Sequence, residues 1–317
     1  MTRQHVTRLA PSPTGALHLG NARTFLVNHL LARRNGWRML LRVEDLDGPR
    51  VKEGADRQML DELRWLGLDW EPPVVYQSAR AEAYHQALRR LIDRGEAYPC
   101  TCSRKDIEHA AGAPHAEDGA GSYPGTCRGR FASVDQARQS GRPVAWRVKV
   151  NGDPIELVDQ LHGPVKFNLA ALGGDFVIFK NVDQAAYQLA VVVDDAEAGV
   201  DCIVRGDDLL DSAARQIHLR RLLGIDGPAV RYWHLPLVVG SDGKRLAKRH
   251  GDTRLAHYRD AGASSQRVLG LLGYWSGLLE TRRDATMDEL ERIFDLDRLP
   301  RQSVVFCQAD DDYLRSR

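Results

Sequence analysis

Residues 6–36 read VTRLAPSPTGALHLGNARTFLVNHLLARRNG, and this stretch decides the class of fold. Its apolar start at 6–10 predicts a short strand, which the turn Pro-Ser-Pro-Thr-Gly at 11–15 ends. Apolar residues then recur at helical spacing over 19–31, until an Asn-Gly pair stops them. A strand, a tight turn and a long helix in this order are typical of an α/β protein.

The next residues extend this pattern. Residues 38–45 (RMLLRVED) predict a second, buried strand, and the apolar spacing predicts helices at 54–66 and 80–94. Because strands and helices alternate, we expect a parallel sheet with helices packed on it.

The pattern changes after about residue 100. Residues 103–126 are rich in Ala, Gly, Pro and Asp without a clear period, which indicates a long excursion. Alternating runs between 143 and 180 predict a small antiparallel element. Strand-like runs and one helical run follow, at 189–195 (LAVVVDD), 202–206 (CIVRG), 212–223 (helical) and 235–240 (LPLVVG). Only helical patterns are present from about residue 253, so we expect one α/β domain that is interrupted by an insertion.

Composition limits the class of protein. The 317 residues suggest about two domains, and 43% apolar with 27% charged residues is ordinary for a globular protein. No apolar run approaches the roughly 18 residues of a membrane span, and the N-terminus lacks the apolar region of a secretory signal. We therefore expect a cytoplasmic protein without a membrane partner.

The net charge of +1 does not exclude a nucleic-acid partner, because binding depends on a local basic surface.

The turn before the first long helix has the features of a phosphate site. Glycines at 15 and 20 let a ligand approach the backbone, and the start of the helix offers free N–H groups and a positive dipole end. His18 in this turn can donate hydrogen bonds to phosphate oxygens as charge develops on them. The alternative is that His18 merely caps or packs against the helix.

A second stretch, GSDGKRLAKRHG at 240–251, has glycines at both ends and several basic residues between them. Such a loop can move and can clamp a polyphosphate. Alone, a basic loop is more often a solvated turn, but together with the first turn it indicates nucleotide chemistry.

The two stretches resemble the HIGH and KMSKS signatures of class I aminoacyl-tRNA synthetases. RLAPSPTGALHLGNART is similar to the opening of glutamyl-tRNA synthetases, and the likeness continues to about residue 275. It includes LLRVEDLD, YQSAR, GEAYPCTCS, FVIFKNVDQAAYQLAVVVDD and VRGDDLLDSAARQIHL. The resemblance implies a Rossmann-like class I catalytic domain with a small inserted zinc-binding α+β subdomain and a short helical C-terminal region. The boundaries we expect are 1–99 and 187–252 for the two halves of the catalytic domain, 100–186 for the insertion, and 253–317 for a helical, stem-contact-like region.

The resemblance also implies roles for single residues. His18 and Lys248 would be the catalytic residues, and the ATP site would consist of His18, Gly20, Asn21 and Lys248, with Mg²⁺ as the metal. The glutamate site would consist of Arg8, Ser12, Glu44, Tyr187 and Arg205. A guanidinium fork suits a carboxylate and a carboxylate suits an ammonium group, which agrees with this set.

Two features of these residues qualify the assignment. The alternative for Arg205 is a salt bridge with Asp207 or Asp208. The second signature also departs from the usual KLSKR, because Arg245 and Ala247 replace its first lysine and its serine. The lysine position itself is retained, so we expect activity.

Three clustered cysteines point to a metal. Cys100, Cys102 and Cys127 could supply three thiolates, and a structural zinc site needs four ligands. His109, His115 and Tyr123 are candidates for the fourth ligand, and spacing alone favours a histidine. A subset of the resembled family has C-x-C followed by Y-x₃-C, which implies the set Cys100, Cys102, Tyr123 and Cys127. The alternative is free or merely buried thiols.

The length of the chain after the second signature bears on which tRNA would accept the glutamate. Only residues 250–317 follow it, whereas full-length glutamyl-tRNA synthetases continue into anticodon-binding domains. The shorter form resembles the glutamyl-queuosine tRNA(Asp) synthetases, which activate glutamate without tRNA and transfer it to the queuosine base of tRNA(Asp). We therefore expect L-glutamate, ATP and queuosine-containing tRNA(Asp) as partners of a monomeric protein. A minimal glutamyl-tRNA synthetase and a non-catalytic paralogue that binds tRNA or amino acid are the alternatives.

Overall fold

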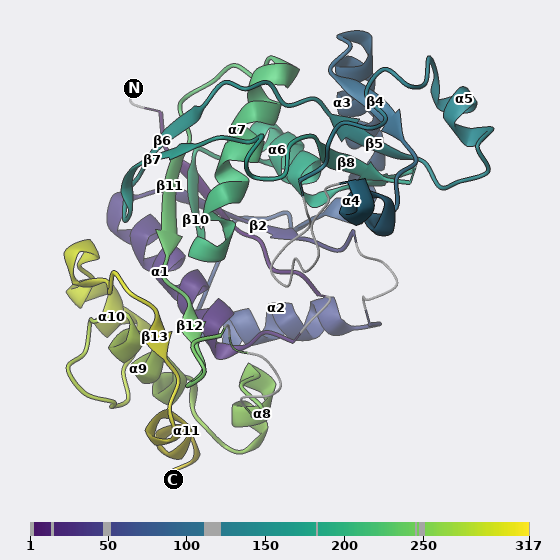
Figure 1. Ribbon diagram of the computed structural model, residues 1–317. Helices are drawn as coiled ribbons and strands as arrows, with labels where there is room; N and C mark the ends of the chain where they lie inside the picture. Colours follow the sequence, from purple (N-terminus) through teal and green to yellow (C-terminus); the bar gives the residue numbers. More distant parts are fainter. Residues whose placement is uncertain are drawn as a thin grey trace.

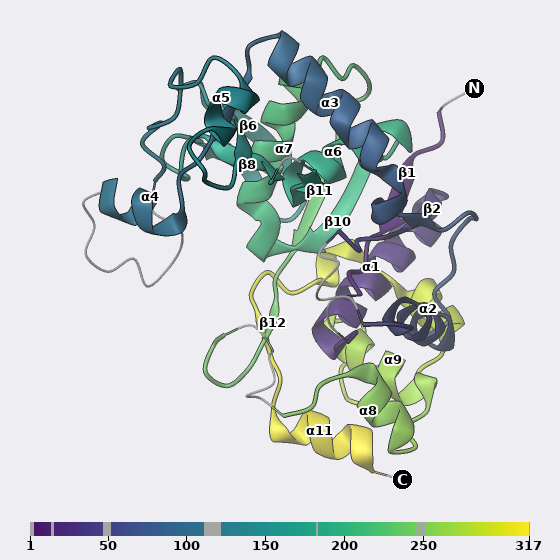
Figure 2. The ribbon, with the colours of Figure 1, turned by 90° about the vertical axis from the view of Figure 1, so that its right-hand side faces the viewer.

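The computed structural model describes residues 3–13, 16–46, 52–110, 122–181, 183–244, 246 and 251–316, with 109 and 110 described by their backbone only. Lys248, Arg245, Ala247 and His115 lie outside the described residues. The antiparallel sheet and the short helices near it lie at one end of the molecule and the C-terminal helices at the other, in both orientations of the ribbon (Figures 1 and 2).

A parallel sheet forms the centre of the fold. Strands β1 (Val6–Leu9), β2 (Arg38–Val43) and β3 (Val75–Tyr76) pair in parallel, in the order β1-β2-β3. A second part has the order β10 (Cys202–Gly206), β11 (Arg231–Leu235), β6 (Ile155–Asp159), β7 (Gly163–Phe167), where β10, β11 and β6 are parallel. The backbone N–H of Asp201 donates to the carbonyl of Val6 at 3.0 Å, so the second part continues the first beside β1.

The longer helices outside the C-terminal region connect these strands. They are α1 (Leu19–Asn35), α2 (Ala55–Trp65), α3 (Ala81–Asp93), α6 (Tyr187–Glu197) and α7 (Leu210–Leu223). The predicted strand at 6–10, the strand at 38–45 and the helices at 54–66 and 80–94 are confirmed to within a few residues. Helix α1 ends as expected, because Gly36 takes the left-handed conformation at φ 63° that stops a helix.

The predicted strand at 189–195 is wrong, because these residues lie inside helix α6. Three successive valines favour a strand, since β-branched side chains are restricted in a helix. All seven residues from 189 to 195 are buried, so the helix has no polar face there whose period would identify it. Tertiary burial therefore outweighs the local preference.

The predicted antiparallel element is confirmed. Strands β4 (Ala97–Cys100), β5 (Ala145–Val148), β8 (Phe176–Lys180) and β9 (Gln184–Ala185) pair antiparallel in this order, beside the short helices α4 (Arg104–Ala110) and α5 (Val134–Arg138). The hairpin β6–β7 comes from the same stretch of sequence but joins the parallel sheet, through Asp159 opposite Tyr232 on β11. The stretch predicted as an insertion thus also contributes strands to the central sheet.

The C-terminal region is mostly helical, with one strand that the sequence did not predict. Its helices are α8 (Leu255–Asp260), α9 (Ser265–Trp275), α10 (Met287–Ile293) and α11 (Gln308–Arg315). Strand β13 (Val304–Val305) pairs in parallel with β12 (Val238–Val239). In the run predicted as a strand at 235–240, β12 is the only part beyond Leu235 that forms a strand. In the part of the chain that the structure describes, short 3-10 turns lie at Gln77–Arg80, Asp207–Leu209 and Leu296–Arg298.

One hydrophobic core joins the C-terminal helices to the rest of the α/β fold. Leu26 and Leu30 of α1 share a cluster of buried side chains with Leu271 and Trp275 of α9. Helix α1 is thus covered by the sheet on one side and by α9 on the other, and Figure 2 shows α1 close to α9. None of the helices in the described part of the chain combines the length and the apolar character that a membrane span needs.

Gly270 in α9 provides a test of this packing. A Cβ at Gly270 would lie 1.8 Å from the carbonyl oxygen of Arg283, so the backbone of one segment must move. We expect Gly270→Ala to lower the free energy of unfolding by at least about 2 kcal/mol, as overpacked sites do. Denaturant unfolding measures the change. The control is Gly152→Ala, where a Cβ would meet nothing within 4 Å; equal stability of the two variants would contradict the described contact.

Candidate active site

A pocket of about 170 Å³ lies at the carboxyl ends of β1 and β10, where α/β proteins commonly bind ligands. Its lining includes seven of the predicted site residues, namely Arg8, His18, Gly20, Asn21, Glu44, Tyr187 and Arg205. The other lining residues are Ala10, Thr24, Phe25, Val204, Gly206, Asp208, Leu209, Leu237 and Val238. Residues from both halves of the catalytic sheet therefore meet in one small cavity.

His18 occupies the N-cap position of α1, with extended backbone. Its side chain makes no capping hydrogen bond, so the simple capping role considered for it does not apply. The first turn of α1 contains no acidic residue, which leaves the positive end of the helix dipole available to an anion. A Cβ at position 20 would lie 3.3 Å from Nδ1 of His18, so glycine leaves room beside the imidazole.

The chain that follows the second signature returns to this turn. The backbone N–H of Leu19 donates to the carbonyl of Thr253 at 3.0 Å, and Leu255 donates to Leu17 at 2.9 Å. His18 itself forms an isolated antiparallel bridge with Arg254. Thr253 is thus fixed to the first signature. It follows Lys248 by five residues, and Lys248 itself lies outside the described residues.

Ser12 differs from the other predicted glutamate ligands. It is exposed, does not line the pocket, and donates its hydroxyl to the carbonyl of Glu44 at 3.0 Å. The backbone N–H of Glu44 donates to Pro11 at 2.9 Å, so the turn after β1 and the end of β2 are tied together. In this structure Ser12 contacts the backbone of Glu44, and Glu44 in turn lines the pocket.

Arg8 belongs to a buried network of charges. Its Nε donates to Oδ1 of Asp195 at 3.2 Å, and Arg42 from β2 contacts the same oxygen. Arg42 also donates to Oε1 of Glu44 at 3.0 Å. Burial opposes ionisation of Asp195, but the charges of Arg42 and Arg8 outweigh it and hold the pKa of this carboxyl below its usual range. Burial raises the pKa of Glu44, against the opposing charge of Arg42.

Arg205 has a different environment. Its Nε donates to Nε2 of His234 at 3.0 Å, its Nη1 to Oε1 of Gln216 at 2.9 Å, and its Nη2 to the carbonyl of Leu209 at 3.2 Å. In the described part of the chain, then, all three guanidinium nitrogens bind neutral groups, and the salt bridge with Asp207 or Asp208 considered above does not form. Arg205 is only 6% exposed, so it is a buried cation without a directly bonded carboxylate.

Sequence reasoning missed Arg42 and Asp195. Arg42 interrupts the apolar strand RMLLRV two residues before Glu44, and Asp195 closes the apolar run LAVVVDD. A charged residue inside a buried run needs a partner, so its presence in the sequence indicates a buried ion pair or hydrogen bond. The sequence does not say which residue that partner is, because Arg42 and Asp195 are separated by 153 positions.

The four predicted zinc ligands come together. The Sγ atoms of Cys100, Cys102 and Cys127 all lie within 4.8 Å of one another. The hydroxyl of Tyr123 lies 3.4 Å from Sγ of Cys100 and 4.0 Å from Sγ of Cys102. Sulfur atoms about 2.3 Å from a tetrahedral zinc are about 3.8 Å apart, so the donor set fits a zinc ion. The side chains of His109 and His115 are not described.

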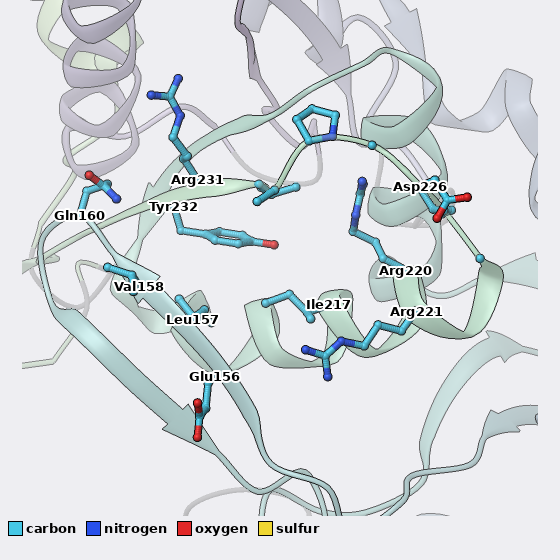
Figure 3. Close-up of a pocket in the computed structure, with 16 residues that line it drawn as sticks. Glu156, Leu157, Val158, Gln160, Ile217, Arg220, Arg221, Asp226, Arg231 and Tyr232 are labelled. Carbon is cyan, nitrogen blue, oxygen red and sulfur yellow. The ribbon is translucent and has the colours of Figure 1, made fainter.

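A second, larger cavity of about 680 Å³ lies elsewhere, between β6, α7 and β11 (Figure 3). It contains none of the predicted site residues. Figure 3 shows Arg220 and Arg221 on the same helix and the ring of Tyr232 projecting into the space. Size alone does not identify an active site, and the smaller pocket is the one that brings the predicted site residues together at the start of α1.

Comparisons with known proteins identify the family. The family model described as tRNA synthetases class I (E and Q), catalytic domain, matches residues 4–311. A relative named Glutamyl-Q tRNA(Asp) synthetase, from Rhodopirellula baltica, is 43% identical over 96% of this chain and 97% of its own length. One named Glutamate--tRNA ligase, from Azorhizobium caulinodans, is 40% identical over 96% of this chain and 63% of its own length.

A solved structure is similar over nearly the whole chain. The crystal structure of a glutamate-tRNA synthetase from Elizabethkingia anophelis superposes with a TM-score of 0.82 at 25% sequence identity. The match covers 98% of this chain and 70% of that one. The antiparallel sheet, the parallel sheet and the C-terminal helices are therefore parts of one known architecture, and the chain belongs to the family of class I tRNA synthetases for Glu and Gln (E and Q).

Proposed function

We propose that the protein activates L-glutamate with ATP and Mg²⁺, without tRNA, and transfers the glutamate to the queuosine base of tRNA(Asp). The observation that carries the first step is the pocket in which the start of α1 meets Arg8, Glu44, Tyr187 and Arg205. The transfer to queuosine is supported by the names of relatives such as the one from Rhodopirellula baltica.

The chemistry of the first step needs orientation and charge stabilisation more than covalent help. An oxygen of the glutamate α-carboxylate attacks the α-phosphorus of ATP, and the bond to pyrophosphate breaks, which gives glutamyl-adenylate. His18, Gly20 and Asn21 at the start of α1 would hold the phosphates, together with Lys248. Mg²⁺ would bind phosphate oxygens and neutralise the charge that leaves with pyrophosphate.

Arg205 is suited to the substrate carboxylate. Arg8 and Arg42 already contact Asp195, whereas the partners of Arg205 among the described residues are neutral. A buried cation without a carboxylate partner favours an anionic ligand, because the ligand then supplies the missing charge. Glu44, which also lines the pocket, would meet the ammonium group.

The decisive assay is glutamate-dependent exchange between ATP and pyrophosphate in the absence of tRNA. We expect exchange, followed by transfer of labelled glutamate to tRNA(Asp) that contains queuosine and none to tRNA(Asp) that lacks it. No exchange by folded protein with Mg²⁺ would refute the proposed activation. Charging of the 3′ end of tRNA(Glu) instead would favour the alternative function that the glutamate–tRNA ligases among the relatives suggest.

Substitution of Arg205 tests its role. Arg205→Ala removes the cation that would face the substrate carboxylate, so we expect KM for glutamate to rise about 30-fold, equivalent to about 2 kcal/mol, with KM for ATP within about twofold. Exchange kinetics at varied glutamate and ATP measure both values. Arg220→Ala is the matched control, since Arg220 lies on α7 in the second cavity and should leave both values unchanged. Equal increases in the two KM values for Arg205→Ala would refute the assignment.

We also propose that Cys100, Cys102, Tyr123 and Cys127 bind one structural zinc ion. The predicted result is about one zinc per chain by atomic emission, lost in Cys102→Ser and retained in the control Cys307→Ser, whose sulfur lies at the exposed start of α11. We expect zinc loss to lower the melting temperature, since a structural zinc adds to folding stability. Zinc-free protein purified from zinc-supplemented cells would exclude the site.

A further inference from the structure

His234 and Asp159 form a buried chain of hydrogen bonds that ends on Arg205. Oδ2 of Asp159 lies 2.7 Å from Nδ1 of His234 and accepts from its backbone N–H at 3.1 Å. Nε2 of His234 lies 3.0 Å from Nε of Arg205. Asp159 and His234 are 1% and 0% exposed, so no solvent competes for these bonds.

The partners of His234 determine its tautomer. Arginine has only donors, so Nε2 of His234 must be the acceptor of the bond from Arg205. The proton of the neutral ring therefore resides on Nδ1, which donates to Asp159. Burial, aided by the charge of Arg205, lowers the pKa of His234 against the opposing effect of Asp159. A protonated ring would also place an N–H group against the N–H of Arg205.

Asp159 is chemically matched to this position. Its Oδ2 accepts from the ring and backbone of His234, while its Oδ1 accepts from the backbone N–H groups of Leu161 and His162 at 2.9 and 3.0 Å. An asparagine would turn one of these oxygens into a donor and oppose two N–H groups. Only a carboxylate accepts from all four donors.

A second neutral contact holds the same arginine. Gln216 accepts from Nη1 of Arg205 and donates to Gln188 at 3.0 Å, and Gln188 donates to Ser212 at 3.0 Å. The guanidinium is thus fixed on two sides by acceptors that carry no charge. Its orientation is set while its positive charge stays available to a ligand in the pocket.

We propose that Asp159 and His234 are positioning residues that hold Arg205 as an un-neutralised carboxylate receptor, and thereby contribute to the selection of an anionic amino-acid side chain. This inference rests on the proposed function. It also gives the β6–β7 hairpin a role, since Asp159 at the end of β6 contacts His234, which in turn contacts Arg205 of the pocket.

A purely structural role for the pair, in which it only fastens β6 to β11, makes a different prediction. Two substitutions at His234 separate the roles. The amide oxygen of His234→Gln reaches about as far as Nε2 and can still accept from Arg205. The shorter His234→Asn can still donate to Asp159 but leaves Nε of Arg205 without its acceptor.

The test is ATP–pyrophosphate exchange with both variants beside the wild type, with melting temperatures as a check of folding. We expect His234→Asn to raise KM for glutamate at least tenfold with KM for ATP within twofold, and His234→Gln to stay within threefold of the wild type for both. Equal KM values for the two variants, or parallel increases for glutamate and ATP, would overturn the proposal. Wild-type protein without exchange would instead refute the proposed function.

A spectroscopic measurement covers the case in which the variants do not fold. In ¹⁵N-labelled wild-type protein, we expect the ring nitrogens of His234 to show a neutral imidazole protonated at Nδ1 between pH 6 and 8. Asp159→Asn, or Asp159→Ala if the asparagine variant is unstable, assigns the signal by shifting it. A ring protonated at Nε2, or a charged ring in this range, would contradict the arrangement.

Discussion

The carboxylate of Asp195 is the contact on which the geometry of the site depends. It lies near the end of α6 and binds Arg8 of β1 and Arg42 of β2, so it joins a helix of the second catalytic half to two strands of the first. Loss of one member of a buried ion pair costs about 3–5 kcal/mol, because the remaining charge is left unpaired. Arg8 and Arg42, and through Arg42 also Glu44, take their positions from this one group.

Arg205 differs from Arg8 and Arg42 in its partners, and this difference determines how a substrate would be oriented in the pocket. Arg8 and Arg42 are already neutralised by Asp195, whereas Arg205 is held by His234, Gln216 and a backbone carbonyl. A substrate with a carboxylate at one end and an ammonium group at the other matches this asymmetry. The same distribution leaves the start of α1, with His18 at its N-cap, for the phosphates of a nucleotide.

Local sequence patterns predicted much of the fold because they reflect which residues are buried and where the backbone turns. The strand before His18, helix α1 with its glycine stop and strand β2 all follow from periodicity and turn residues. Helix α6 did not, since burial on all sides removes the polar face by which a helix is recognised. The motif residues were found in the sequence, but their partners were not. Asp159 and His234, for example, are 75 positions apart, and only the folded chain brings them together.

The central claim is that the pocket receives a carboxylate because no carboxylate of the described residues bonds directly to Arg205. Calorimetric titration with L-glutamate and L-glutamine, in the presence of a non-hydrolysable ATP analogue, tests it most directly. The two ligands are nearly the same in size and differ in the charge at the end of the side chain. The account predicts that glutamate binds at least about 100-fold more tightly, because the amide leaves the buried cation uncompensated. Equal affinities for the acid and the amide would contradict it.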